Sequence, residues 1–534
     1  MTKPKIVIVG AGPGGLAVAL QAAAAGADVT ILEKQSQVGG RTTTVEQAGF
    51  RFDLGPTFFL YPRVLSEIFA SIGRDMWQEI PMQRLDPQYR VTFGAGGAID
   101  ATPDIAEMER QIGELCPRDV GGLTRYMQDN RKKLASFRSI LEEPFERLTD
   151  LLKLRYLPAG RWLRPWRSLA DELRTYFSDP RLLIAFSFQS KYLGMSPFRC
   201  PSLFSILSFL EYEHGIYHPR GGCGQVSVRM AEIAEELGVK IRLNEAVTGF
   251  DFQGRKPTAV KTAAGTYACD SVVINADFAE AMKQLVPNAL RRRWTDEKIS
   301  TKKFSCSTFM LYLGIRGRYD DLPHHSIHIA RDYEKNLQQI EQDFVLPGDP
   351  SFYVQNACVT DRSLAPKGDS TLYVLVPVPH RHAGITWDAS TRTMFRARTL
   401  RQLSEIGLHD VEQRIVTERM ITPDDWQSHY SVYRGAVFNL AHGLDQMLHR
   451  RPHNRFEDLD QVYLVGGGTH PGSGLPVIYE SSRITCKQML PALGLDCSFI
   501  HEAGRRPVDP APQILEPHAG AVSHIANEPE EASV

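Results

Sequence analysis

The N-terminal segment, residues 5–41, joins a strand, a glycine turn, a helix and a second strand in that order. Residues 6–9 are apolar and β-branched, and Gly10, Gly12 and Gly15 follow in G-x-G-x-x-G spacing before an alanine-rich stretch. In such a turn the glycines let the backbone bend, approach a pyrophosphate and bring the helix against the strand. The amides at the helix N-terminus then face the phosphates. The segment therefore predicts a dinucleotide-binding βαβ unit.

A second apolar run, residues 28–32, ends at Glu33. An acidic residue at the end of the second strand holds a ribose hydroxyl in dinucleotide sites, and we expect Glu33 to do so here. Gly39, Gly40 and Arg41 follow. A glycine backbone can lie against a phosphate there, with a fixed cation beside it. A glycine turn without a ligand would explain none of these additions, so a nucleotide site is the favoured interpretation.

The 534 residues exceed one ordinary domain, so we expect subdomains that share a large core. The 61 basic and 62 acidic residues nearly cancel, which argues against a nucleic-acid partner. The 8 cysteines are scattered without a C-x-x-C pair, so we expect reduced thiols in a cytoplasmic protein and no metal site. The sequence has no signal-like start and no run of about eighteen apolar residues, so any membrane contact should be peripheral.

Residues 145–167 combine apolar anchors with cations. Tryptophan and leucine side chains can enter the acyl boundary of a bilayer, while arginine and lysine meet anionic headgroups. An ordinary amphipathic helix packed on the core has the same composition. The segment predicts one of these two structures, and Arg161, Trp162 and Trp166 are the residues on which a membrane-binding test would act.

A second glycine turn lies near the other end of the chain. Residues 462–465 are typical of a buried strand, Gly466, Gly467 and Gly468 follow, and we expect a helix from about Val477. A dinucleotide long enough to touch both turns is FAD, with its adenosine at the first turn and its flavin near the second. The two turns together therefore predict FAD as the cofactor.

With both turns in view, the chain resembles the bacterial-type phytoene desaturases, within the FAD-dependent carotenoid desaturases and isomerases, whose fold is similar to that of amine oxidases. The resemblance covers nearly everything except the C-terminal tail. It implies an FAD enzyme that removes hydrogen from a long apolar polyene. The matching segments are residues 9–17, 39–41, 52–57, 218–224, 359–366, 374–380, 451–455 and 466–476.

The same resemblance implies roles for individual residues. The first turn holds the ADP half of FAD, Val247 offers its backbone to the adenine, and the second turn lines the pyrophosphate and the flavin. Asp53 stabilises the turn beneath the isoalloxazine ring and does no chemistry. The implied cofactor-binding residues are Gly10, Gly12, Gly15, Glu33, Gly39, Gly40, Arg41, Gly55, Val247, Gly467, Gly468, Leu475 and Pro476.

The predicted fold class is α/β, with a Rossmann-like FAD-binding domain, a mixed α+β substrate domain and a helical, membrane-facing subdomain. A strand ending at Val247 and another over residues 271–275 should return to the nucleotide-binding sheet. Strands over residues 89–93, 307–315 and 372–378 should build the substrate domain. The expected boundaries are residues 1–61, 218–280 and 456–503 for the FAD-binding domain, 62–217 for the helical region, 281–455 for the substrate domain and 504–534 for a disordered tail.

Forming a conjugated double bond from a CH2–CH2 unit removes a hydride, which flavin can accept, and a proton. The sequence does not identify the catalytic base: His470 is a candidate, as are Glu211, Glu213 and Arg220, and a structural role is favoured for each. Oxygen or a membrane quinone is the expected electron acceptor. A carotenoid isomerase that uses reduced flavin, a flavin amine oxidase and a non-catalytic polyene-binding protein are the alternatives.

Overall fold

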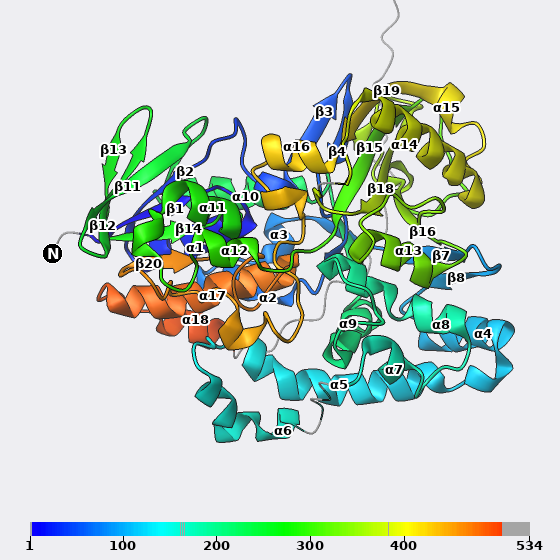
Figure 1. Cartoon of the computed structure of the whole chain (residues 1–534), viewed down its shortest axis with the longest axis horizontal. Helices are drawn as coiled ribbons and strands as arrows, with labels where there is room; N and C mark the ends of the chain where they lie inside the picture. Colours follow the sequence, from blue (N-terminus) through cyan, green and yellow to red (C-terminus); the bar gives the residue numbers. More distant parts are fainter. Residues whose placement is uncertain (1–2, 161, 163, 165, 383, 505–534) are drawn as a thin grey trace, which may run out of the picture.

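Five parallel strands form the sheet that begins with residues 5–9, at the left of Figure 1. The computed structural model describes residues 3–160, 162, 164, 166–382 and 384–504. Three stretches of chain far apart in sequence supply the strands, in the order β10-β2-β1-β14-β20. The strands are β1 (Lys5–Val9), β2 (Asp28–Leu32), β10 (Lys240–Arg242), β14 (Ser271–Ile274) and β20 (Val462–Leu464).

Helices cover both faces of this sheet. Ile6 and Ile8 of β1 pack in one apolar cluster with helices α1, α10 and α17, whereas Val7 and Val9 join a second cluster with α11. Alternate side chains of a strand point to opposite faces, so a strand covered on both faces reads as a continuous apolar run. The helices are α1 (Pro13–Ala24), α10 (Gly224–Glu236), α17 (Leu475–Ala492) and α11 (Phe278–Leu285).

The chain leaves the parallel sheet earlier than predicted. β10 ends at Arg242, and Val247 begins β11 (Val247–Gln253), which pairs with β12 (Lys256–Thr262) and then β13 (Thr266–Ala268) in an antiparallel sheet. The expectation of one strand ending at Val247 is therefore wrong. Between the two strands Asn244 adopts a φ of 56°, a left-handed conformation that asparagine tolerates and that turns the chain out of the sheet.

A second sheet of seven strands lies in the other half of the molecule, at the upper right of Figure 1. Its strand order is β19-β15-β18-β17-β16-β7-β8. One face packs Phe309, Leu311 and Leu313 against α14 (Ala389–Gln402), and the alternating residues face the interior of the molecule. The strands are β7 (Tyr89–Phe93), β8 (Ala98–Ala101), β15 (Ser307–Ile315), β16 (His325–Ile329), β17 (Phe352–Gln355), β18 (Ser370–Val378) and β19 (Ile415–Ile421).

Small strands and mostly helical segments connect the two sheets (Figure 1). The small strands form a hairpin of β3 (Thr44–Gln47) with β4 (Phe50–Asp53), and a three-stranded sheet of β5 (Phe59–Leu60), β9 (Ile216–Pro219) and β6 (Met82–Arg84). The remaining α-helices are α2 (Arg63–Ser71), α3 (Met76–Glu79), α4 (Ile105–Leu115), α5 (Gly122–Leu141), α6 (Leu157–Gly160), α7 (Leu169–Leu173), α8 (Pro180–Ala185), α9 (Ile206–His214), α12 (Asp296–Ser300), α13 (Tyr333–Glu341), α15 (Val411–Arg414), α16 (Pro423–Ser428) and α18 (Ser498–Ala503).

The basic and apolar segment, residues 145–167, is a series of short turns and not one amphipathic helix. Two 3-10 turns, Leu148–Leu152 and Leu154–Tyr156, precede α6, and the segment lies below α5 in Figure 1. Phe145 and Tyr156 are buried against the end of α5, with Trp162 packed beside them. Arg161 and the predicted tail beyond residue 504 lie outside the described residues. In the part of the chain that the structure describes, no helix is long and apolar enough to cross a membrane.

Candidate active site

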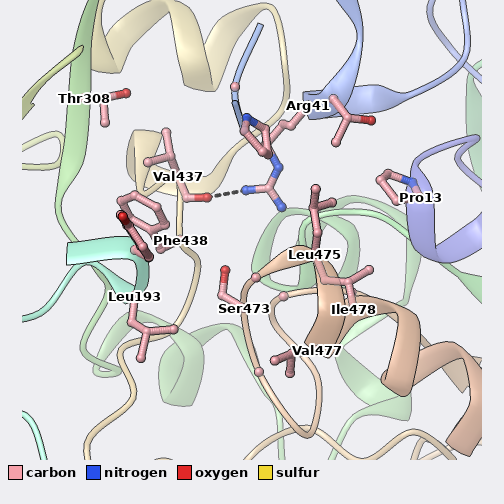
Figure 2. Close-up of a pocket in the computed structure, with 18 of the residues that line it drawn as sticks. Pro13, Arg41, Leu193, Thr308, Val437, Phe438, Ser473, Leu475, Val477 and Ile478 are labelled. Carbon is pink, nitrogen blue, oxygen red and sulfur yellow. Dashed lines mark hydrogen bonds between the residues drawn. The ribbon is translucent and has the colours of Figure 1, made fainter. Parts of the chain in front are cut away.

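A continuous cavity of about 670 Å³ runs from the first glycine turn, past the second, to the inner face of the seven-stranded sheet. In Figure 2 Pro13 and Arg41 approach it from the N-terminal segment, and Ser473, Leu475 and Ile478 from the C-terminal one. Parallel strands that meet at one edge bring these two ends of the chain together. The cavity therefore joins the predicted nucleotide site to the predicted substrate domain.

Most of the predicted cofactor-binding residues line this cavity. Three do not, namely Gly15, Gly39 and Gly468. A Cβ on Gly15 would lie 2.3 Å from the Gly10 carbonyl oxygen, so Gly15 allows the helix to approach the strand. The residues that line the cavity are Gly10, Gly12, Glu33, Gly40, Arg41, Gly55, Val247, Gly467, Leu475 and Pro476.

Glu33 is held at the ribose end of the cavity by two backbone amides. Its Oε2 accepts a hydrogen bond from the Ala11 N–H at 2.8 Å, and its Oε1 accepts one from the Gln35 N–H at 2.8 Å. Glu33 is 5% exposed. Each carboxylate oxygen has a second lone pair, so the side chain retains acceptors for ribose hydroxyls. The backbone contacts fix the direction in which those acceptors point.

Arg41 supplies a cation between the two glycine turns. Its guanidinium donates to the Val437 carbonyl, as the dashed line in Figure 2 shows. Burial lowers its pKa, and the neighbouring Asp277 opposes that shift. Burial in turn raises the pKa of Asp277 to about 6, against the effect of Arg41. The remaining N–H groups of Arg41 suit the pyrophosphate that the two turns would hold.

Arg451 holds the second glycine turn in place. It is 0% exposed and donates to the carbonyls of Gly467 at 2.6 Å and Thr469 at 3.2 Å. It also donates to those of Leu440 at 3.2 Å and Ala441 at 3.4 Å. Burial lowers its pKa to about 9. The sequence shows Arg451 only as part of a family motif, because the carbonyls that it contacts are distributed over two loops.

The turn at residues 53–58 lies between the two sheets. The Asp53 Oδ1 accepts a hydrogen bond from the Gly224 N–H at 3.2 Å, and the Tyr373 hydroxyl donates to the Gly55 carbonyl at 2.7 Å. Burial raises the pKa of Asp53 to about 6. Asp53 does not line the cavity, whereas Gly55 does. Asp53 thus connects the segment 52–57 to the glycine turn at residues 218–224 through a hydrogen bond outside the cavity.

A hydrogen-bonded chain lies on the cavity wall beside this turn. The Tyr353 hydroxyl is 2.7 Å from Thr57 Oγ1 and 2.7 Å from His325 Nδ1. Phe58 stacks on the His325 ring at 4.1 Å between centroids. Burial lowers the pKa of His325 well below its usual value, so its imidazole is neutral. No sequence motif marks this hydrogen-bonded group, because its members lie on separate strands and a turn.

The bases considered from the sequence do not line the cavity. His470 is within 3.0 Å of the Glu143 carbonyl, and burial lowers its pKa to about 4. Glu211 is completely buried and accepts from Tyr89 at 2.9 Å. Glu213 pairs with Arg131 near the surface, and Arg220 is exposed. None of these four side chains is therefore placed to take a proton from a substrate in the cavity.

The residues present fit FAD. Gly12 and Gly467 would leave room for close approach of a pyrophosphate, Glu33 would accept hydrogen bonds from the ribose, and Arg41 would supply the cation. Among the described residues no group of three or more histidine, cysteine or acidic side chains could hold a metal ion. The cavity between the two glycine turns therefore presents the groups that FAD would need.

Comparison with known proteins agrees with this geometry. A family described as "Flavin containing amine oxidoreductase" matches residues 13–490. The chain is 42% identical over 484 residues to a 4,4'-diapophytoene desaturase (4,4'-diapolycopene-forming) of Methylomonas sp, covering 90% of this chain and 94% of that protein. It is 36% identical over 524 residues to an all-trans-zeta-carotene desaturase of Myxococcus xanthus, covering 96% and 97%.

A solved oxidoreductase from Methanosarcina mazei has a TM-score of 0.60 and 16% identity, over 91% of this chain and 100% of that one. At that identity the likeness concerns the fold alone. The two curated relatives are matched over almost their whole length and far above that identity. The chain therefore belongs to the flavin-containing amine oxidoreductases and, within them, to the FAD-dependent carotenoid desaturases.

Proposed function

We propose that this enzyme introduces conjugated double bonds into an acyclic polyene precursor of the C30 or C40 class. The observation that carries the proposal is the cavity, which is continuous between the FAD-binding turns and an apolar chamber. Met310, Leu375 and Ile327 project into that chamber from the inner face of the seven-stranded sheet. Such a wall suits a long hydrocarbon, and it excludes water from the charge that develops during reaction.

FAD, when bound, supplies the hydride acceptor. After hydride loss the polyene carries a cation, and the C–H bond on the adjacent carbon breaks so that its electrons form the second bond of C=C. We assign the released proton to Tyr353 Oη, whose own proton passes to His325 Nδ1. The 2.7 Å contact between these two atoms supports the assignment, because a C–H bond next to a cation is acidic enough to protonate even an imidazole whose pKa burial has lowered.

Anaerobic turnover of the FAD-loaded protein tests this proposal. With phytoene or dehydrosqualene we expect bleaching of the flavin and, by chromatography, a product with added double bonds. Oxygen or a quinone should then restore the oxidised flavin. Tyr353→Phe should slow product formation about 100-fold while FAD content is unchanged. An isomer without added double bonds would instead identify an isomerase, and an unaltered polyene would identify a binding protein.

We also propose that residues 145–167 contact the membrane surface from which such a substrate is drawn. The large apolar side chains with the highest exposure anywhere in the described chain all lie here: Leu148 (63%), Leu152 (76%), Leu154 (80%) and Trp166 (80%). Exposed apolar side chains beside Arg147 and Lys153 fit an anionic bilayer interface. Leu203 packs against the buried side of this segment and also lines the cavity, so the segment adjoins one wall of the cavity.

Flotation with anionic liposomes tests the membrane contact. Serine at Leu152, Leu154 and Trp166 should reduce the bound fraction about tenfold, because three exposed anchors are lost while the buried cluster stays intact. A matched control replaces Val345, Val416 and Leu444, which are exposed apolar residues outside this segment, with serine. Equal binding by the two triple variants would rule out this surface. Trp162 is unsuitable for the test because it packs inward.

A further inference from the structure

One wall of the substrate chamber carries polar side chains, and a hydrocarbon substrate would offer these side chains no hydrogen-bond partner. Tyr333, Asn336, Leu337 and Ile340 of α13 all line the cavity. Their spacing of i, i+3, i+4 and i+7 places them on one face of the helix. Two of the four side chains on this face are therefore hydrogen-bonding groups in a chamber that is otherwise mainly apolar.

The orientation of Asn336 is fixed by a backbone contact. Its Oδ1 accepts a hydrogen bond from the Ser351 N–H at 3.3 Å, so the amide NH2 group must occupy the other position. Asn336 is 3% exposed and Tyr333 is 5% exposed. Neither the Asn336 Nδ2 nor the Tyr333 hydroxyl has a hydrogen-bond partner among the described residues. Buried groups of this kind are normally satisfied, so a ligand is expected to complete them.

A third donor lines the same part of the cavity. Lys191, from the 3-10 helix Phe188–Leu193, places its Nζ 3.0 Å from the Glu341 Oε1 at the end of α13. An ammonium group has three N–H donors, and this contact uses one. Lys191, Tyr333 and Asn336 all line the cavity, and Lys191 is paired with the last residue of the helix that carries the other two. Lys191, Asn336 and Tyr333 can all donate hydrogen bonds here, so the ligand group that suits them is a hydrogen-bond acceptor.

We propose that this α13 wall binds an oxygen atom, hydroxyl or carbonyl, at the end of the polyene. The inference rests on the proposed desaturase function and narrows its substrate class from a pure hydrocarbon to an end-oxygenated polyene. An oxygen accepts hydrogen bonds from Asn336 Nδ2 and from Tyr333 or Lys191, whereas a methyl-ended chain leaves those groups unsatisfied. By binding the terminal oxygen, these three side chains set how far the polyene enters the cavity. They therefore set which CH2–CH2 unit of the polyene lies beside the flavin.

The test compares two polyenes with the same carbon skeleton and the same number of conjugated double bonds, one ending in a hydroxyl and one in a methyl group. FAD-loaded protein should convert the hydroxylated polyene with a kcat/KM about tenfold higher and bind it about tenfold more tightly, measured by quenching of tryptophan fluorescence. Asn336→Leu and Tyr333→Phe should each reduce this ratio toward one, mainly through slower conversion of the hydroxylated polyene.

Tyr61→Phe is the matched control, because it removes a hydroxyl from another wall of the same cavity and should keep the tenfold ratio. Equal binding and conversion of the two polyenes by wild type would overturn the inference, as water would then satisfy the α13 wall, and would leave the desaturase function standing. If neither polyene is converted, the desaturase function fails, and the binding ratio still decides whether the α13 wall recognises oxygen.

Discussion

Replacing Arg451 with leucine should lower the free energy of unfolding by about 4 kcal/mol and release FAD during purification. The guanidinium is fully buried and donates to four carbonyls, two of them in the second glycine turn. Leucine leaves those buried acceptors unsatisfied and frees the turn to move. Arg451→Lys should recover little, because a point charge cannot reach all four carbonyls as a planar fork does. Urea denaturation and the flavin absorbance after gel filtration measure the two effects.

The matched control is Arg455→Leu, four residues further along the same motif. Arg455 is exposed, so its replacement should change the unfolding free energy by less than about 0.5 kcal/mol and leave FAD bound. Stability within about 1 kcal/mol of wild type for Arg451→Leu, with FAD retained, would show that the second turn keeps its shape without the arginine.

Replacing Gly10 with alanine should lower the free energy of unfolding by about 3 kcal/mol and weaken FAD binding more than tenfold. The Gly10 backbone has a φ of +96°, which costs an L-residue about 1–2 kcal/mol. An added Cβ would also lie 2.4 Å from the Asn275 carbonyl oxygen, so β14 or the turn must shift, at about 1–3 kcal/mol. Asn275 donates back to the Gly10 carbonyl at 3.0 Å, so the shift would also disturb the pyrophosphate end of the cavity.

Gly26→Ala separates the two causes. Gly26 has a φ of +93° with nothing within 4 Å of an added Cβ, so its replacement measures the conformational cost alone. We expect a loss of about 1 kcal/mol and unchanged FAD affinity, measured by titration of flavin fluorescence. If Gly10→Ala and Gly26→Ala behave alike, close packing on Asn275 has no part in forming the nucleotide site.

Much of the nucleotide-binding half could be predicted from the sequence. Strands buried on both faces read as continuous apolar runs, so the predicted strands over residues 6–9, 28–32, 271–275 and 462–465 lie within one residue of those in the structure. The error at Val247 arose where two short strands lie close together and one asparagine turns the chain between sheets. The local sequence pattern predicts well that a segment is a strand, but it predicts poorly which other strand that segment pairs with.

The substrate side could be predicted only in outline. The strand at residues 89–93 was visible from its alternation, but its pairing with β16, more than two hundred residues later, was not. In residues 145–167 the composition indicated both burial and exposure, and only the structure shows that Trp162 packs inward while Trp166 is 80% exposed. The expected amphipathic helix is wrong, because the described residues of this segment form short turns, and the membrane contact stays a prediction.

The sequence by itself predicted that this chain binds a dinucleotide at its first turn and, with the second turn, that the dinucleotide is FAD. The first prediction follows from local rules, since glycine spacing, a terminal acid and apolar runs act within a few residues of one another, and the second from pairing two such turns. Only the tertiary structure decided what faces the substrate. Tyr353 meets His325 across neighbouring strands, and Asn336 accepts a hydrogen bond from the Ser351 N–H in the cavity wall. Such contacts depend on which elements pack together, and packing is a property of the whole chain.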